Sequence, residues 1–306
     1  MKIYLNYNYT QKNIAHLEIS EGVRSDSKFT DKIISILQKG DLVLRDLGFF
    51  RIDSLKKIEE KEAYYLSRYF LSTNLYIKGK KRDLLEFLES QKHLAVIDKE
   101  VQISMKKFST RLIAIRVSDD VYNQRVRSLK KAYQQRRKTP KESTLKLQRY
   151  VIFITNIPKE MIEAKYIGTI YRLRWEIELC FKRWKSIFKI DRLTGINGNR
   201  TLCFIYAKLI AILLFNNFEQ YALSLAYQRD RELSLDKFFK WIVDRDRFQR
   251  LLAKEFTVTQ FLRMIEINIE RLFKDKRRKR LSSLDLLLTS ASFYCCDDIM
   301  NPKIGA

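Results

Sequence analysis

Proline, glycine, histidine and cysteine are all scarce in this sequence of 306 residues, which contains 3 Pro, 8 Gly, 2 His and 4 Cys. So few prolines and glycines predict long regular elements, and the length allows one large domain or two smaller ones with a real core. The cysteines are Cys180, Cys203, Cys295 and Cys296. Four cysteines cannot crosslink so long a chain, so we expect reduced thiols and a cytosolic protein. Without a Cys-x-x-Cys pair, a structural zinc site is a poor interpretation.

Negative charge is also in short supply, because 60 Lys and Arg residues face only 36 Asp and Glu, for a formal net charge of +24. The 46% hydrophobic content argues against disorder. A folded protein with this excess usually meets a polyanion, although a ribosome-like or membrane-surface role remains open. The N-terminus is polar and strand-like rather than a signal peptide. The most apolar stretch, Phe204–Phe215, is too short to span a bilayer, so we expect a soluble protein.

The first 80 residues alternate between strand and helix patterns. Strands are expected at Lys2–Asn8, Ile14–Ile19, Leu42–Leu44 and Ala63–Phe70, and helices at Asp31–Lys39 and Ser54–Lys61. The strand Leu42–Leu44 ends in Arg45 and Asp46. This order predicts an α/β (α+β) fold in which helices pack on a mixed sheet.

Residues 71–160 interrupt this rhythm with a strand-rich insertion. Its expected strands are Val101–Met105, Thr110–Val117 and Tyr150–Thr155. Between the last two lies Val121–Arg149, with ten Lys or Arg residues and one acid, Glu142. This segment is either a solvated helix and loop or an arm that follows a nucleic-acid backbone.

From residue 160 onward the pattern is helical, with long helices expected over about 161–188 and 200–227 and shorter ones to about 292. The cluster Arg271–Arg280 holds seven basic residues and one acid. It is either a phosphate-contacting segment or a soluble tail.

The helix expected around residues 171–188 has two faces. At 100° per residue, four polar side chains lie within an arc of about 60°: Tyr171, Arg174, Glu178 and Lys185. A separate apolar stripe contains Leu173, Ile177, Cys180, Trp184 and Phe188. On geometry alone, a surface helix stabilised by ordinary ion pairs explains the polar face.

The spacing Tyr-x2-Arg-x3-Glu-x6-Lys, however, resembles the signature of the DDE transposases of the insertion-sequence-four family. The surrounding segments RWEIELCFKRWKSIFKIDRLTG, LVLRDLGFF, AYYLSRY and YAKLIAILL are similar to this family in the same order. The resemblance covers most of residues 1–225.

The resemblance implies a ribonuclease-H-like mixed sheet, interrupted by a β-rich insertion and followed by a helical C-terminal region. It divides the chain into core (1–70), insertion (71–160), core with the glutamate helix (161–228) and basic C-terminal region (229–306). It also implies a homodimer that acts on the terminal inverted repeats of double-stranded DNA in the bacterial cytoplasm, associated with the nucleoid.

The site that the resemblance implies joins carboxylates to DNA-binding side chains. Asp46 and Glu178 are the catalytic ligands of Mg²⁺ or Mn²⁺, which prefer carboxylate oxygens. Tyr171, Arg174 and Lys185 bind the transposon end, where arginine can hold a phosphate bidentately. An aromatic side chain that stacks a flipped base is also implied, and Trp175 is one candidate.

The family's first aspartate, on a strand before Lys2–Asn8, has no counterpart in this chain. Asp26 and Asp31 follow two strands and do not take its place by order. We therefore expect an N-terminally truncated chain without efficient cleavage. A non-catalytic DNA-binding remnant that interferes with a full-length relative, or a basic nuclease of the same fold, remains the alternative.

Overall fold

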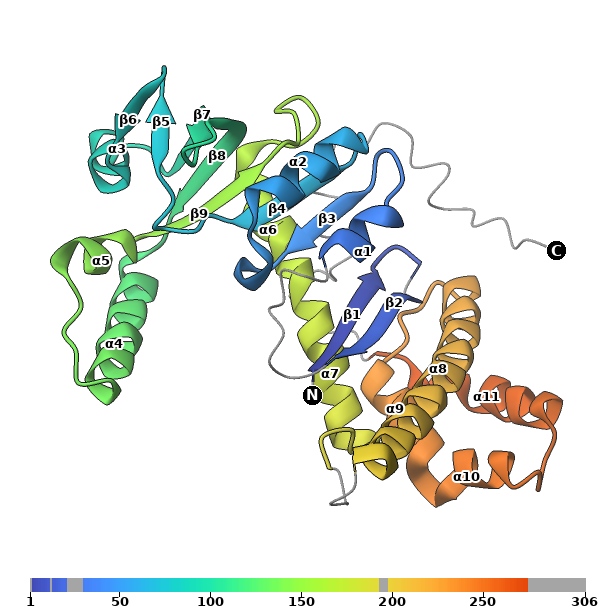
Figure 1. Cartoon of the computed structure of the whole chain (residues 1–306). Helices are drawn as coiled ribbons and strands as arrows, with labels where there is room; N and C mark the ends of the chain where they lie inside the picture. The colour runs from blue at the N-terminus through green and yellow to red at the C-terminus, as the bar shows by residue number, and fades with distance from the viewer. Residues whose placement is uncertain (1, 12, 21–29, 193–197, 275–306) are drawn as a thin grey trace. The chain divides into compact units, whose positions relative to one another are not determined.

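The chain is described from a computed structural model, which covers residues 2–11, 13–20, 30–192 and 198–274. It divides into two compact units. The first contains Ser20–Arg174, and the second contains Ile3–Ile19 and Trp175–Arg280. Each unit is described separately below, and Figure 1 gives the labels of the helices and strands.

The first unit is built on a seven-stranded mixed sheet with the order β3-β4-β9-β8-β7-β5-β6. The strands are β3 (Leu42–Arg45), β4 (Tyr64–Arg68), β5 (Leu75–Ile77), β6 (Lys80–Arg82), β7 (Val96–Ile103), β8 (Phe108–Arg116) and β9 (Tyr150–Thr155). Only β3 and β4 pair in parallel, and the other pairs are antiparallel. The strands of the expected insertion therefore continue the sheet that β3 and β4 begin.

The helices of the first unit connect these strands. They are α1 (Thr30–Ser35), α2 (Ile52–Glu60), α3 (Leu84–Ser90), α4 (Asp119–Gln135), α5 (Glu142–Leu147) and α6 (Ala164–Tyr171). Short 3₁₀ turns are η2 (Leu47–Phe49) after β3 and η3 (Arg172–Arg174) after α6. In Figure 1, α4 and α5 lie apart from the helices that cover the sheet.

One face of the sheet packs against α2, whose Leu55 and Ile58 are fully buried. The polar side chains on this side of the sheet form hydrogen bonds with neighbouring strands. The Tyr65 hydroxyl donates to Thr110 Oγ1 at 2.9 Å, and Thr110 donates to the carbonyl oxygen of Thr155 at 3.1 Å. These bonds join β4, β8 and β9, because a buried hydroxyl without a partner would destabilise the fold.

The opposite face of the sheet packs against α6. Successive residues of a strand point to opposite faces, so Ile113 and Phe153 lie on the side away from Tyr65. A Cβ atom at Gly168 of α6 would lie 3.0 Å from Ile115 Cδ1 and 3.9 Å from Phe153 Cε2. Glycine at this position therefore lets α6 approach β8 and β9 closely.

A buried arginine ties the sheet to the segment that leads into α6. Arg111 on β8 donates from Nε and Nη2 to the two carboxylate oxygens of Asp98 on β7, at 3.0 and 2.9 Å. Its Nη1 donates to the carbonyl oxygens of Ile157 and Ile162 at 3.0 and 2.9 Å. The Arg111 side chain is 2% exposed, so these bonds compensate for the cost of burying its charge.

The second unit combines a hairpin with helices. Its elements are β1 (Lys2–Asn8), β2 (Asn13–Ser20), α7 (Trp175–Ile187), α8 (Gly198–Gln228), α9 (Leu235–Val243), η4 (Asp244–Asp246), α10 (Arg247–Leu252) and α11 (Val258–Leu272). Apolar side chains of the hairpin pack against Trp184 and Leu209. A second cluster, centred on Phe215, Phe238 and Phe261, joins α8, α9 and α11.

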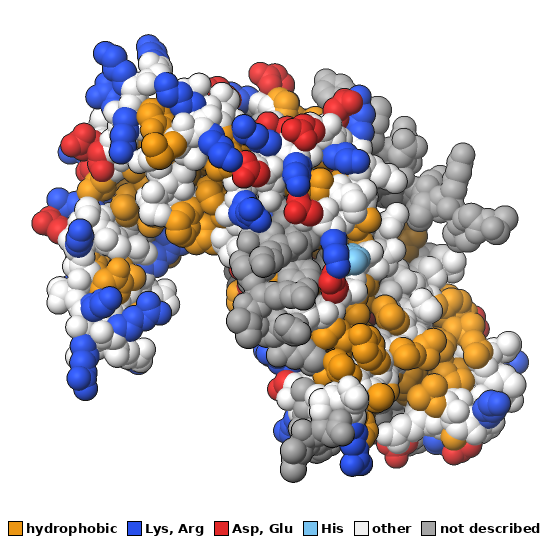
Figure 2. Space-filling model, in the orientation of Figure 1, with side chains coloured by type: hydrophobic (Ala, Val, Ile, Leu, Met, Phe, Trp, Pro, Cys, Tyr) orange, Lys and Arg blue, Asp and Glu red, His pale blue; other side chains and the backbone are white. Residues whose placement is uncertain are grey.

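Helix α8 is 31 residues long and agrees with the long helix expected over about 200–227; it extends well beyond the apolar stretch Phe204–Phe215. By length and composition it could cross a bilayer, and 22% of its most apolar 18-residue stretch is buried. This is weak evidence for a membrane span, because a core helix of a soluble protein meets the same criteria. The buried side of α8 also contains the charged Glu219, and Figure 2 shows apolar side chains gathered on the surface of this unit.

The fold class expected from the sequence is confirmed: a mixed sheet with helices, of the ribonuclease-H-like type, followed by a helical C-terminal region. Several boundaries differ. The helix expected at Asp31–Lys39 ends at Ser35, and the helix expected over 161–188 is interrupted by η3. The four-part domain division remains a prediction. Residues 275–280 of the basic cluster, and the helices expected beyond them, lie outside the described residues.

The Arg111 contacts predict a large cost for removing their anionic partner. Asp98→Asn should lower the free energy of unfolding by about 3 kcal/mol, because it leaves a buried guanidinium without a counter-charge. Urea unfolding followed by fluorescence measures this. The matched control is Asp53→Asn, whose exposed pair with Lys106 should contribute little. Equal stabilities of the two variants would contradict a structural role for the Arg111 contacts.

Candidate functional site

Asp46 lies directly after β3, at the point where the strand turns into η2. Its Oδ1 accepts a hydrogen bond from the backbone N–H of Leu47 at 2.9 Å, so Asp46 caps the turn. The residue is exposed, whereas Arg45 before it is buried. The strand end therefore presents a carboxylate to solvent in a fixed backbone position.

Tyr171, at the end of α6, contacts the same strand end. Its hydroxyl donates to the carbonyl oxygen of Arg45 at 3.1 Å, and its side chain is buried. Burial raises the pKa of the Tyr171 hydroxyl, the Arg174 guanidinium opposes this shift, and the Asp46 carboxylate reinforces it. Tyr171 therefore remains a protonated donor. The sequence placed Tyr171 on a polar outer face, and the structure instead places it against the end of β3.

Arg174 contacts the ring of Tyr171. Its guanidinium carbon lies 5.7 Å from the centroid of the Tyr171 ring, a cation–π distance. The first unit thus brings together three of the five residues that the sequence singled out: Asp46, Tyr171 and Arg174.

Sequence reasoning missed two residues that support Tyr171. The Phe153 ring packs 5.1 Å from the Tyr171 ring, and the Arg68 guanidinium lies 5.7 Å from the Phe153 centroid. Arg68 and Phe153 are paired across β4 and β9. The segment AYYLSRY, which contains Arg68, was a usable signal, but pairing with Phe153 is not readable from local sequence.

Glu178 and Lys185 lie on α7 in the second unit. Within this helix, steps of 100° place both on the side opposite Cys180 and Trp184. Cys180 and Trp184 are buried, Glu178 is half-buried and Lys185 is exposed. The predicted apolar stripe of this helix is therefore confirmed. Since η3 separates α6 from α7, the single continuous arc expected for Tyr171, Arg174, Glu178 and Lys185 is not one α-helical face.

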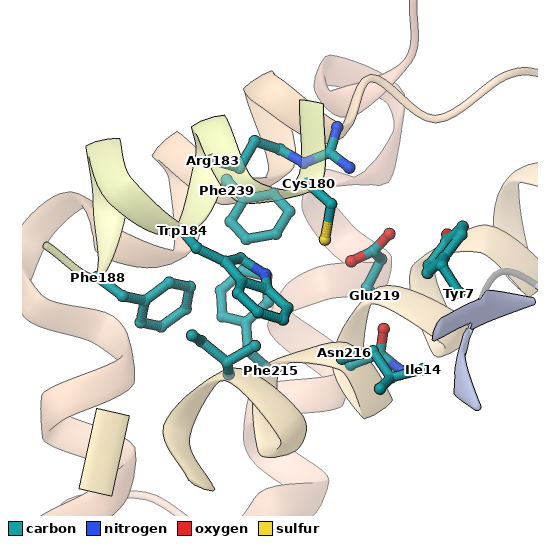
Figure 3. Close-up of a pocket in the computed structure, with 11 residues that line it drawn as sticks. Tyr7, Ile14, Cys180, Arg183, Trp184, Phe188, Phe215, Asn216, Glu219 and Phe239 are labelled. Atoms are coloured by element: carbon teal, nitrogen blue, oxygen red, sulfur yellow. The ribbon is translucent and has the colours of Figure 1, made fainter. Parts of the chain in front are cut away.

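The buried side of α7 lines a small, mostly apolar cavity that the sequence did not reveal (Figure 3). Its volume of about 20 Å³ suits one water molecule and excludes a nucleotide. Tyr7, Cys180 and Glu219 point into it among aromatic rings. Burial raises the pKa of Cys180 to about 12, so the thiol stays protonated and is no nucleophile. Glu219, a lone acid in an apolar helix pattern, was the available sequence signal.

The carboxylates fit a divalent metal in chemical kind, because Mg²⁺ and Mn²⁺ take hard oxygen ligands. Asp46 and Glu178 belong to different units. Among the described residues, no group of three His, Cys, Asp or Glu side chains lies close enough to hold a metal ion. Asp31 is paired with Lys57 Nζ at 2.6 Å, and Asp26 lies outside the described residues.

Comparisons with known proteins identify the family of the chain. The profile of the transposase DDE domain matches residues 1–214. The transposase of insertion sequence element IS231E from Bacillus thuringiensis subsp. finitimus is 32% identical over 267 residues, 80% of this chain and 55% of the relative. The transposase of insertion sequence element IS1151 from Clostridium perfringens is 26% identical over 312 residues, 94% of this chain and 66% of the relative. No solved structure matches.

The match to the transposase DDE domain covers the larger part of the chain and therefore identifies its class. The chain belongs to the DDE transposases of the insertion-sequence-four type. It spans between about half and two thirds of the length of the curated relatives named above.

The two sides of α7 predict opposite outcomes for neighbouring substitutions. Trp184→Ala should lower the free energy of unfolding by about 3–5 kcal/mol, because it removes a buried aromatic side chain. Lys185→Ala, at an exposed position, should change it by less than about 0.5 kcal/mol. Denaturant unfolding compares the two variants. A larger loss for Lys185→Ala would show that the faces of α7 are assigned the wrong way round.

Proposed function

We propose that this chain is the transposase of an insertion sequence, a DNA-binding protein that moves its element by cut-and-paste transposition. The supporting observation is the contact between Tyr171 of the signature and the strand end that carries Asp46. The family match and the transposase relatives support the same proposal. The net charge of +24 suits a polyanionic substrate. Like its family, the protein would act in the cytoplasm, at the nucleoid.

In this proposal, Asp46 and Glu178 hold the divalent metal that the family generally uses. When bound, such ions activate the attacking water or 3′-hydroxyl and stabilise the leaving oxygen of a phosphodiester. The hydroxyl of Tyr171 holds the backbone before Asp46, and the Leu47 backbone N–H donates to the Asp46 carboxylate.

Arg174 and Lys185 would bind phosphates near the transposon end. Arg174 is oriented by its contact with the Tyr171 ring, and a planar guanidinium can hold a phosphate bidentately. Lys185 is exposed on the same side of α7 as Glu178 and supplies a point charge. Trp175, 55% exposed at the start of α7, is the candidate for stacking a flipped base. The protein would work as a homodimer on paired terminal inverted repeats.

Cleavage tests the metal assignment. The substrate is an end-labelled duplex that carries the DNA bordering the reading frame, incubated with Mg²⁺ or Mn²⁺. Because no third carboxylate lies close enough to them among the described residues to complete a metal site, we expect weak metal-dependent nicking at most. Any such nicking should be lost in Asp46→Asn and Glu178→Gln, since both keep the side-chain shape but remove a negative ligand. Both variants should still bind the duplex in EDTA. Nicking that survives both substitutions would contradict the assignment, whereas a chain that binds duplex DNA without any nicking would favour the non-catalytic DNA-binding remnant.

Binding tests the two cations. Arg174→Gln and Lys185→Gln should each weaken affinity for the end duplex by roughly 10-fold or more, as expected for loss of a hydrogen bond to a charged group. Fluorescence anisotropy in EDTA measures this without cleavage. Lys240→Gln, at an exposed position on α9, is the matched control for lost charge. If Lys240→Gln weakens binding as much as Lys185→Gln, Lys185 has no special contact.

A further inference from the structure

A basic arm, residues 119–149, leaves the sheet between β8 and β9 and is not used in the proposal above. It consists of α4, the turn at 136–141 and α5. Neither helix contains a fully buried residue. Figure 2 shows Lys and Arg side chains gathered over this part of the surface, at the lower left.

The helix α4 has an inner and an outer face. Half-buried side chains recur at helical spacing on the inner face, at Tyr122, Arg125, Val126, Leu129 and Tyr133. On the opposite side lie the exposed Arg127, Lys130 and Lys131, which fall within an arc of about 100°. Exposed amides, Asn123 and Gln134, share this outer face. Its side chains are therefore cationic and amide groups that can bind phosphates and base edges.

The arm is held firmly at its base. Arg149 pairs with Asp119 at 2.5 Å, and its guanidinium lies 4.2 Å from the centroid of the Tyr122 ring. Arg125 Nη1 approaches the carbonyl oxygens of Gln148 and Tyr150, at 3.4 and 3.5 Å. These contacts join the start of α4 to the start of β9. The outer face is thus presented on a helix whose orientation is fixed before any ligand binds, which lowers the entropic cost of binding.

Arginine side chains and aromatic rings, in contact with one another, lead from the candidate site towards the base of the arm within the first unit. Arg174 contacts the Tyr171 ring, the Tyr171 ring contacts Phe153, and Phe153 contacts Arg68. Burial lowers the pKa of Arg125, and the nearby charge of Arg68 lowers it further. The guanidinium groups of Arg68 and Arg125 therefore repel each other, and a polyanion lying over both would relieve that repulsion.

An ordinary solvated helix would be expected to balance its charges with ion pairs at helical spacing. On the arm such a pair exists at Glu142 and Lys146 of α5. In the described part of the chain, no salt bridge involves Arg127, Lys130 or Lys131. The outer face of α4 thus lacks the internal compensation found on α5 and has the charge of a polyanion-binding surface.

We infer that double-stranded DNA held at the candidate site continues along the outer face of α4, where Arg127, Lys130 and Lys131 contact its phosphates. The inference rests on the proposed function and deepens it. The 17 residues of α4 are about 25 Å long. Duplex DNA carries one charge per about 1.7 Å of its axis, so about 15 phosphates pass along this length and contacts are readily available. The contacts are to the backbone, so they are independent of sequence.

The test is the salt dependence of duplex binding by the full chain in EDTA. The variant Arg127→Gln, Lys130→Gln, Lys131→Gln removes three charges from exposed positions. We expect the slope of log affinity against log salt to become shallower by about 2–3, since each phosphate contact contributes about 0.9. Affinity near 0.1 M salt should fall on the order of 100-fold. The loss should be the same on the end duplex and on a scrambled duplex.

The matched control is Lys80→Gln, Lys81→Gln, Arg82→Gln, which removes three exposed charges from β6 at the far edge of the same sheet. If the control variant changes the salt slope by less than a third as much as the arm variant does, the inference is supported. Equal changes in the two variants, or no change in the arm variant, would overturn the inference while leaving the proposed function intact. If the arm variant binds an RNA hairpin more weakly but binds duplex DNA as well as the unaltered chain does, the inference is also overturned. If the unaltered chain binds no duplex, the proposed function itself fails.

Discussion

The Arg111 guanidinium is the contact on which the position of the candidate site depends. Its N–H groups donate to the carboxylate of Asp98 on β7 and to the carbonyl oxygens of Ile157 and Ile162. One side chain therefore connects the antiparallel β7–β8 pair to the segment that leads into α6. A buried charge without such partners would be strongly destabilising, and so this geometry is tightly specified. The start of α6 is thereby fixed against the sheet, and Gly168 lets the helix lie close to β8.

Because α6 is positioned in this way, its last residue can reach the end of β3. The Tyr171 hydroxyl donates to a backbone carbonyl oxygen, and the Tyr171 ring contacts both Phe153 and Arg174. The tyrosine of the signature therefore contacts both the backbone before Asp46 and the Arg174 guanidinium. A residue identified by its spacing to a carboxylate thus lies against a strand that is far away in the sequence.

Sequence patterns were most informative where local physics decides the outcome. The alternation over Lys2–Asn8 coincides with β1, and the short run before Asp46 coincides with β3, because burial on one or both faces fixes strand patterns. The break at η3 was missed because α-helical and 3₁₀ turns share nearly the same apolar spacing over three residues. The long helix expected over about 200–227 coincides with α8, because the helical pattern continues past Asn216 and Asn217 to the buried Ala222. The ring contacts of Phe153 depend on strand pairing, which no local pattern encodes.

The distribution of charge follows from the same division between buried and exposed positions. Where a cation is buried, as at Arg111, the fold supplies an acid and carbonyl oxygens. Where acids are exposed, as at Asp31 and Asp53, a lysine neutralises each of them, so few carboxylates are left to balance the remaining positive charge. Much of the excess lies on segments that have little core to build, such as the arm 119–149, whose residues are all exposed or half-buried. Such a surface is unfavourable for a monomer in isolation because of its self-repulsion, and it becomes favourable when a polyanion lies against it. The positive charge is therefore placed where it can serve binding without weakening the core.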